Sequence, residues 1–503
     1  MEVLKMKLFE ILVALIYGVL VLWWAISSKK QAEKGGKEFF ASYKTFGALL
    51  AGIAAATSGM SGFGLVGVPG LVYKLGGAVW YITIFFALSF GLMMWLNGKP
   101  MRMMGEIITT ETFADLGYHR FNSNTVRFLI ALNLIICVWA YLGTQILAAG
   151  YILHYIFGIS IKAGGVIVLL YTILYTVYGG MVGSIKVDFL QGLLKIGSAL
   201  AVLLGFYYIT GGMSNATLAI SASKIFGTSY VDPIGHPSTV TLPLVFAWIF
   251  ALGIGTIGQP HVNTKLYSLK DYKSLRFFGV TSGIAYSIMS LFTLFPAMAV
   301  FYLISTGKMA IFKNPDDTIF HFMSHLPPIL AILLFAGLLA ATMSTSSSFL
   351  VIGSAVFTLI YPRSFGKKLD QKQEVVWGRW ALIILSIGAI FFGLFGGYLI
   401  ALLGVLGLGT FIATSMPVII GYQWQRASKE AAIVAELITL LMSIFVSVIY
   451  VQLLKGKMPG GIPDYAYMIL LTTIVMIFVS LFTKGSAREN LPPELKIFFK
   501  YME

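Results

Sequence analysis

The chain contains long uncharged apolar runs, and a cluster of glycines interrupts one of them. No charged residue occurs from Thr45 to Tyr73, a length that suffices to cross a bilayer, which takes about 20 apolar residues. The middle of this run reads TSGMSGFGLVGVPG, residues 57–70, and its glycines and proline weaken a helix. Irregular backbone inside a bilayer is tolerated only where it is buried in protein or lines a cavity. The run therefore predicts a membrane span that is broken beside a polar group.

The rest of the chain is similarly apolar. Of the 503 residues, 58% are hydrophobic and only 11% are charged, and the mean hydropathy is +0.87. These values exclude an ordinary soluble enzyme and predict an all-α polytopic membrane protein. About thirteen transmembrane helices are expected. They lie near residues 7–26, 46–73, 78–98, 127–155, 163–180, 188–211, 241–258, 277–304, 328–360, 379–396, 399–422, 430–453 and 466–483.

The basic residues favour one orientation in the membrane. If the N-terminus is outside, alternate loops place 25 of the 35 Lys and Arg residues in the cytoplasm and nine outside, with Lys195 inside a helix. This excess predicts a multi-pass plasma-membrane protein whose C-terminus is cytoplasmic. The net charge of +15 therefore reports orientation, so no nucleic-acid partner is predicted. Membrane lipid is an expected partner, and no obligate protein partner is predicted.

A second break follows in the apolar run 241–258, which ends in GIGTIGQPH at residues 253–261. Each break lies in the first helix of a five-helix set, and an odd number of helices per set makes the second set inverted relative to the first. Paired broken helices in such repeats mark a transporter binding site near the middle of the membrane. The alternative is that the glycines only allow helices to pack closely. The predicted organisation is an extra helix and cytoplasmic loop at 1–45, a first repeat at 46–211, an external loop at 212–240, a second repeat at 241–423, and two helices with a short tail at 424–503.

The solute is predicted to bind between the two broken segments. Unwound backbone exposes N–H and C=O groups, and the positive N-terminal ends of half-helices could hold a carboxylate without an arginine. The predicted solute-binding residues are Ser58, Ser61, Gly62 and Phe63 on the first segment and Thr256, Gly258 and Gln259 on the second.

Hydroxyl groups gather in the uncharged run that contains AATMSTSSSF, residues 340–349. Ala341, Ser344, Thr345 and Ser348 follow a spacing that places them on one helical face, with Ser347 beside it. A face of hydroxyl oxygens suits a hard monovalent cation. The alternative is that these hydroxyls bond back to carbonyls of the preceding turn or across to a neighbouring helix.

These motifs together resemble the sodium:solute symporter family, in particular its proline and pantothenate permease branch. The resemblance is carried by the first broken segment, by YTVYGGMVGSIKVDFLQ at 175–191, by GQPH at 258–261 and by MSTSSS at 343–348. It implies a leucine-transporter-type core of five plus five inverted helices, in which the first and sixth core helices are broken. One extra helix would precede this core and two would follow it.

The resemblance also implies two cation sites. The usual sodium site would use main-chain oxygens of Thr57, Met60 and Ala341 with the hydroxyls of Ser344 and Thr345. A second sodium site would correspond to Asp188, Ser344, Ser347 and Ser348. Asp188 is equally explained as a carboxylate that caps the start of a helix. Sodium is then the coupling ion, and no cofactor or other metal is expected.

Four departures from the proline permeases put proline in doubt as the solute. Those proteins carry Asp at the position of Gly59, Trp at Phe63, and Trp and Tyr at Leu252 and Thr256. The predicted function is therefore sodium-coupled symport, by alternating access, of a small polar or carboxylate-bearing solute such as an amino acid, pantothenate or a short organic acid. Proton coupling is the alternative, and a transporter-like membrane sensor is the rival from another class.

The remaining ionisable residues indicate no enzyme. His261, His321 and His325 belong to no metal or nucleophile motif, and the last two are expected to be solvated in an external loop. Glu10, Lys195 and Glu436 are expected near helix ends or on peripheral helices, where long charged side chains reach the membrane interface.

Overall fold

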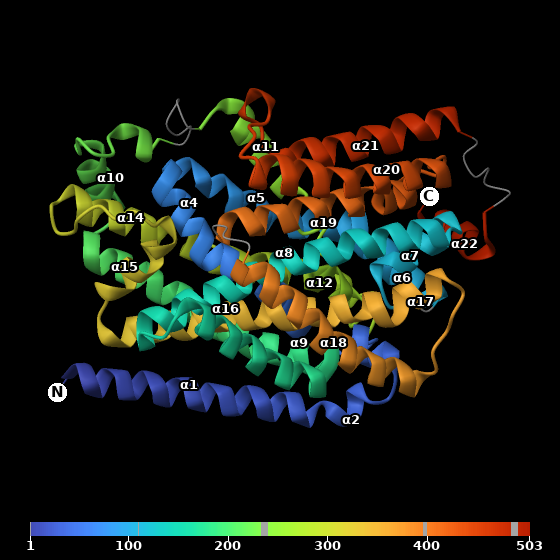
Figure 1. Ribbon diagram of the computed structural model, residues 1–503, viewed down its shortest axis with the longest axis horizontal. Coiled ribbons are helices and arrows are strands. Elements are labelled where there is room, and N and C mark those ends of the chain that lie inside the picture. Colours follow the sequence, from blue (N-terminus) through green and yellow to red (C-terminus); the bar gives the residue numbers. More distant parts are fainter. Residues whose placement is uncertain (1, 109, 233–239, 396–399, 484–490, 503) are drawn as a thin grey trace.

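The structure is a computed structural model that describes residues 2–108, 110–232, 240–395, 400–483 and 491–502. Within these ranges the chain is all-helical, as predicted, and the only β-type pairing described is an isolated bridge between Phe46 and Leu269. Figure 1 shows the longer helices running side by side as a bundle.

The helices follow one another with short connections. In the first half they are α1 (Glu2–Ser27), α2 (Lys29–Ala32), α3 (Ala48–Gly59), α4 (Val68–Leu75), α5 (Tyr81–Met93), α6 (Lys99–Ile107), α7 (Phe113–Phe121), α8 (Asn124–Phe157), α9 (Ile161–Thr210) and α10 (Met213–Ser221). In the second half they are α11 (Leu242–Gly253), α12 (Pro260–Asn263), α13 (Ser274–Met289), α14 (Leu291–Ser305), α15 (Thr318–Ser324), α16 (Pro328–Ala355), α17 (Tyr361–Ser364), α18 (Gln371–Phe395), α19 (Ile400–Gln423), α20 (Lys429–Leu441), α21 (Asp464–Phe482) and α22 (Pro493–Met502). Short π and 3-10 segments are η1 (Lys37–Ala41), η2 (Phe63–Gly67), η3 (Gly77–Trp80), η4 (Met94–Gly98), η5 (Thr228–Tyr230), η6 (Thr264–Leu266), η7 (Pro315–Asp317), η8 (Val356–Ile360), η9 (Met442–Leu453) and η10 (Pro459–Gly461).

Nine helices in the described ranges are long and apolar enough to cross a membrane, and the bent pair formed by α3 with η2 and α4 raises the number to ten. One of the nine is α9, whose 50 residues join two predicted spans. Gly180 interrupts it with φ 51° and ψ −150°, a backbone region that favours glycine. Its two halves therefore meet at a kink.

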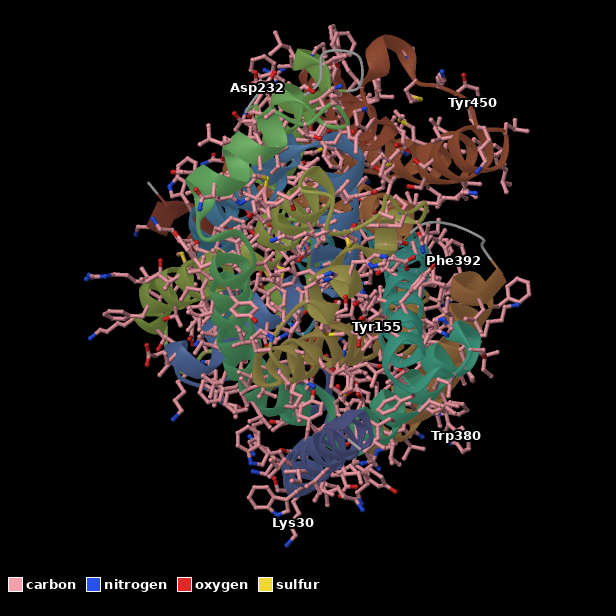
Figure 2. All side chains as sticks on the ribbon, turned by 90° about the vertical axis from the view of Figure 1, so that its left-hand side faces the viewer. Lys30, Tyr155, Asp232, Trp380, Phe392 and Tyr450 are labelled. Atoms are coloured by element: carbon pink, nitrogen blue, oxygen red, sulfur yellow. The ribbon has the colours of Figure 1, made fainter. Side chains whose placement is uncertain are left out.

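Short segments gather at the two ends of the bundle. Figure 1 shows α10 and α15 at its left-hand end and α2, α7, α17 and α22 at its right-hand end. Figure 2 views the molecule from that left-hand end, so that many helices are seen end-on, with Lys30 on one side and Asp232 and Tyr450 on the other. The α1 end that leads into α2 and the C-terminal helix α22 share the right-hand end.

The two interrupted segments are joined by backbone hydrogen bonds. Lys44 and Phe46, which precede α3, donate backbone hydrogen bonds to the carbonyls of Tyr267 and Ser268, which follow η6. Lys270 in turn donates to the Phe46 carbonyl at 2.9 Å. This contact fixes the start of one interrupted segment against the end of the other.

Some predicted features lie outside the described residues. They are the junction between the runs that end at 396 and begin at 399, part of the 212–240 loop, part of the tail after 483, and the side chain of Glu10.

Candidate functional site

The first interruption exposes backbone carbonyls in the middle of the protein. α3 ends at Gly59, and Met60 takes an extended conformation, with φ −86° and ψ 91°. The chain then turns by 54° into the segment Phe63–Leu75. Because a helix leaves its last carbonyls without intrahelical partners, those of Thr57, Ser58 and Met60 are free to accept hydrogen bonds from side chains.

The second interruption is held by buried polar side chains. α11 ends at Gly253, and the chain passes through turns to Gln259, which is extended with φ −82° and ψ 105° before α12 begins. The Ile257 carbonyl accepts hydrogen bonds from the amides of Asn97 at 2.7 Å and Asn263 at 2.6 Å. These bonds replace the helical partners that the break removes.

Lys195 occupies the position of the predicted first sodium site. It lies on the second half of α9, is fully buried, and directs its Nζ to the carbonyls of Thr57 at 2.6 Å and Met60 at 2.7 Å and to the Ser344 hydroxyl at 2.8 Å. Gly192, one turn earlier, allows this approach, since a Cβ there would lie 2.3 Å from the Thr57 Oγ1. Three of the five predicted sodium ligands therefore hold an ammonium group.

The other two predicted ligands of that site bond elsewhere. The Thr345 hydroxyl donates to the Ser58 carbonyl at 3.0 Å, and the Ala341 carbonyl accepts from the Ser344 hydroxyl at 3.2 Å. All five predicted residues are fully buried. They meet where α3 breaks against α16, which is the region that the sequence predicted.

A second lysine, Lys265, occupies the predicted second sodium site. Its Nζ lies 3.1 Å from Asp188 Oδ2 and donates to the hydroxyls of Ser58 at 2.7 Å and Ser348 at 3.0 Å. The Ser348 hydroxyl also donates to Asp188 Oδ2 at 3.2 Å. Asp188 and Lys265 are both fully buried, so this is an ion pair inside the protein. Ser347 lies next to the pair and bonds to Ser184 at 2.9 Å.

Several predictions about single charged residues are wrong. Lys195 is in the core rather than at the membrane interface, and Lys265, counted among loop residues, is buried as well. Asp188 does not cap a helix, because it lies inside α9 after the Gly180 kink. Glu436 is also buried, accepting hydrogen bonds from Asn133 at 2.8 Å and Thr414 at 2.5 Å. Each of these groups has neighbours from distant parts of the sequence, which explains why the local pattern gave no signal.

Two of the four first-segment residues predicted to bind solute contact α8. The Ser61 hydroxyl lies 3.1 Å from the Tyr141 hydroxyl, and the Gly62 N–H donates to Gln145 Oε1 at 2.8 Å. A Cβ on Gly62 would lie 2.7 Å from the Ala148 Cβ. Gly62 therefore has the close-packing role that the sequence left open as the alternative, and a side chain there would disturb the fold.

The second-segment residues predicted to bind solute differ in their surroundings. The Thr256 hydroxyl accepts from the Ser89 hydroxyl at 2.8 Å. A Cβ on Gly258 would lie 2.4 Å from the Ile412 Cα, so this glycine packs directly against the α19 backbone. Gln259 is different, because it is buried and neither its Oε1 nor its Nε2 has a hydrogen-bond partner in the described part of the chain.

The Gln259 amide faces Gly59, one of the positions expected to differ from the proline permeases. A Cβ built on Gly59 would lie 3.7 Å from Gln259 Oε1, and equally 3.7 Å from Phe90 and Tyr286 ring atoms. A buried amide without a partner costs free energy, so this position calls for a polar ligand. The sequence identified Gln259 and Gly59 but gave no indication of the two rings.

A cavity of about 490 Å³ reaches the interrupted segments. Its lining is mainly apolar and includes Phe63 from the first segment, Trp248 and Leu252 from the second, Ile412 from α19 and Tyr465 from α21. Phe63 and Leu252, two of the positions expected to differ from the proline permeases, therefore line this cavity directly.

The histidines of the described ranges include two that lie four residues apart, His321 and His325, a spacing that can place two metal ligands on one helical face. No group of three His, Cys, Asp or Glu side chains in the described ranges could hold a metal ion. His261 is buried, with its Nε2 3.1 Å from the Ser58 carbonyl. His321 lies in the short helix α15 against the Phe312 ring, at a centroid distance of 4.2 Å, and is therefore not a freely solvated loop residue.

Ion pairs join four segments at the right-hand end of Figure 1, where α7 and α17 lie. Arg363 contacts Glu111 at 2.6 Å, Asp115 at 3.2 Å and Glu374 at 3.2 Å, and Arg127 contacts Asp115 at 3.4 Å. Burial raises the pKa of Glu111, and Arg363 opposes that rise. The cluster ties α17 to α18 and to the segment that starts α7.

Two solved transporter structures share this fold. The outward-open state of a sodium-coupled sialic acid symporter superposes with a TM-score of 0.75 at 17% identity, covering 95% of this chain and 98% of that one. A nucleobase-cation-symport-1 family transporter in a closed conformation superposes with a TM-score of 0.54 at 12% identity, covering 92% of this chain and 98% of that one. The chain thus shares its helical fold with these two membrane transporters.

The chain belongs to the sodium:solute symporter family, whose model matches residues 39–439. It is 24% identical to the osmoregulated proline transporter OpuE of Bacillus subtilis, covering 96% of each protein. It is 25% identical to sodium/proline symporter 2 of Staphylococcus saprophyticus, covering 93% of this chain and 92% of that protein. It is also 25% identical to the sodium/pantothenate symporter of Escherichia coli, covering 86% and 89%. The predicted family, the transport role and the exclusion of an enzyme are confirmed.

Proposed function

We propose that this chain is a secondary active transporter that imports a small polar or carboxylate-bearing solute by alternating access. Candidate solutes are an amino acid such as proline, pantothenate or a short organic acid. The family membership supports solute transport, and the solutes named for the relatives, proline, pantothenate and sialic acid, all carry a carboxylate. The observation that carries the proposal is the buried Gln259 amide, which has no partner in the described chain and lies beside Gly59.

The proposed architecture is a leucine-transporter-type core of two inverted five-helix repeats at 46–211 and 241–423. Thirteen crossings result if the α3 to α4 pair is one span, α9 is two spans divided at Gly180, and α1 and the stretch from α11 to η6 each cross once. With the N-terminus outside, the segments α2, α7, α17 and α22 at the right-hand end of Figure 1 are cytoplasmic. This arrangement agrees with the distribution of basic residues.

The proposed solute site lies between the two interrupted segments and is centred on Gln259. The amide offers its NH2 group as donor and its carbonyl oxygen as acceptor to a polar solute, and the rings of Phe90 and Tyr286 flank the space beside Gly59. Ser58, Ser61, Gly62, Phe63, Thr256 and Gly258 are then the shell that shapes this site. In that shell Phe63 faces the cavity, whereas Gly62 and Gly258 set the packing of the backbone.

Family membership also implies a coupling cation, and sodium is the ion that the family name gives. Proton coupling is the alternative that the sequence left open. The residues predicted to bind sodium are the ones that Lys195 and Lys265 contact. These contacts bear on the choice of cation, and through the Lys265 to Ser58 bond they also reach the shell of the proposed solute site.

Uptake into proteoliposomes tests the solute assignment. Purified wild-type protein is given radiolabelled amino acids, pantothenate and short carboxylates, and the transported solute is then used to compare Gln259→Leu with Gln423→Leu. Gln423 is exposed at the end of α19, so its variant is the matched control. We expect Gln259→Leu to raise the KM severalfold while the control stays at the wild-type value. An unchanged KM in Gln259→Leu would refute the proposed site.

A further inference from the structure

Two lysine ammonium groups lie at the positions where the family pattern predicts sodium ions. Lys195 Nζ meets the Thr57 and Met60 carbonyls and the Ser344 hydroxyl, and Lys265 Nζ meets Asp188 and the Ser58 and Ser348 hydroxyls. Asp188 and Lys195 are both on α9, seven residues apart, which is nearly two full turns and places them on the same helical face.

The hydrogen-bond geometry around Lys195 suits an ammonium group. A lysine ammonium has three N–H donors and no acceptor, and here three acceptors lie 2.6 to 2.8 Å away. Two of these acceptors are carbonyls, which cannot donate. The Ser344 hydroxyl has its own acceptors in the carbonyls of Ala341 at 3.2 Å and Thr57 at 3.4 Å. Each donor of Lys195 therefore has one partner.

The same residues do not fit an added sodium ion. A cation at the predicted first site would have to share the Thr57 and Met60 carbonyls and the Ser344 hydroxyl with the Lys195 N–H groups. It would also lie within a few ångströms of a positive charge in a buried region, where like charges repel strongly. At the second site, Asp188 already has the Lys265 ammonium as its counter-ion, at 3.1 Å.

We propose that the ammonium groups of Lys195 and Lys265 take the place of the two sodium ions, so that the chain binds and transports its solute without sodium. Each lysine performs the joining role that a bound ion would have. Lys195 holds α9, the broken end of α3 and α16 together, and Lys265 holds the segment after the second break to α9, α3 and α16. The positive charge thus belongs to side chains of the protein itself, and the contacts between these helices do not depend on the sodium concentration.

Direct sodium binding tests this proposal without any solute. The purified full-length protein is captured on scintillation-proximity beads in detergent, and radioactive sodium is the probe, with potassium keeping the ionic strength constant. We expect the wild type to show no saturable sodium binding. Lys195→Ala removes the ammonium and leaves room beside the Thr57, Met60 and Ser344 oxygens, so this variant should gain saturable binding severalfold above the wild type.

Lys195→Met is the matched control, because its side chain fills the same space without adding an oxygen ligand. It should bind no more sodium than the wild type. Saturable sodium binding by the wild type overturns the proposal, whether or not the variants fold. A folded Lys195→Ala protein that binds no sodium also overturns it, because the lysine would then not be standing in for an ion.

A second test measures solute uptake. It rests on the proposed function, and it can fail independently of the sodium-binding test. Uptake of the solute identified by the proteoliposome panel should be equal in sodium medium and in choline medium. Uptake that requires sodium refutes the proposal that the two lysines replace the sodium ions, while the proposal of solute transport still stands. If no solute of the panel is transported, the proposed function fails, and the sodium-binding result still decides the role of Lys195.

Discussion

Replacing Lys265 by methionine should destabilise the folded protein, because the change leaves the Asp188 carboxylate buried without its cation. The two groups are fully buried and their charged atoms are 3.1 Å apart. At an effective dielectric constant of about 20, opposite charges at this distance attract by about 5 kcal/mol. Removing one partner of such a pair costs about 3 to 5 kcal/mol, whereas replacing both by apolar or neutral groups is often close to neutral.

A double-mutant cycle separates these two cases. Lys265→Met and Asp188→Asn alone should each lower the thermal unfolding midpoint by several degrees, and the double variant should recover most of the loss. The measurement is tryptophan fluorescence on heating in detergent. Lys429→Met is the control, because Lys429 pairs with Glu430 at 3.9 Å on the exposed surface, where such pairs contribute about 0 to 1 kcal/mol. A double variant whose loss equals the sum of the single losses would refute the buried-pair reasoning.

Three further predictions concern single positions. Gly62→Ala should reduce the yield of folded protein, because its Cβ would lie 2.7 Å from that of Ala148. Gly59→Ala, whose Cβ would have no neighbour nearer than 3.7 Å, should fold normally and bind solute more weakly. If the two variants behave alike in size-exclusion chromatography and in uptake, this prediction is contradicted. Cysteine at Lys368 should resist an impermeant thiol reagent in intact cells, and rapid labelling would reverse the proposed orientation. Burial raises the pKa of Asp316 from 3.8 to about 6. The folded protein therefore holds this proton more tightly than the unfolded chain, which stabilises the fold by about 3 kcal/mol at low pH. This contribution is lost as the pH rises from about 4 through 6. Melting curves should show Asp316→Asn gaining stability relative to the wild type over that window, and parallel curves would contradict the assignment.

Local features of the sequence were enough to predict the class of the protein. Long apolar runs require helices in a membrane, since a helix satisfies its own backbone groups there. The glycines at 59–64 and 253–258 lie where α3 and α11 end, because glycine weakens a helix wherever it occurs. The spacing of Ser344, Thr345 and Ser348 also predicted a shared buried face, and that face does meet the first interruption.

The occupants of that face were decided only by the tertiary structure. Helical periodicity states which residues share a face, but it does not state which neighbouring helix that face meets. Lys195 read as an isolated charge and Lys265 as a loop residue, yet packing brings their ammonium groups to Ser344 and Asp188, which are 149 and 77 positions away in the chain. A buried charge is stable only beside partners that compensate for lost hydration, and those partners come from distant segments. The sequence alone therefore predicted a cation at this site, whereas the packing of α9, α3 and α16 brings a lysine ammonium of the chain itself to the predicted ligands.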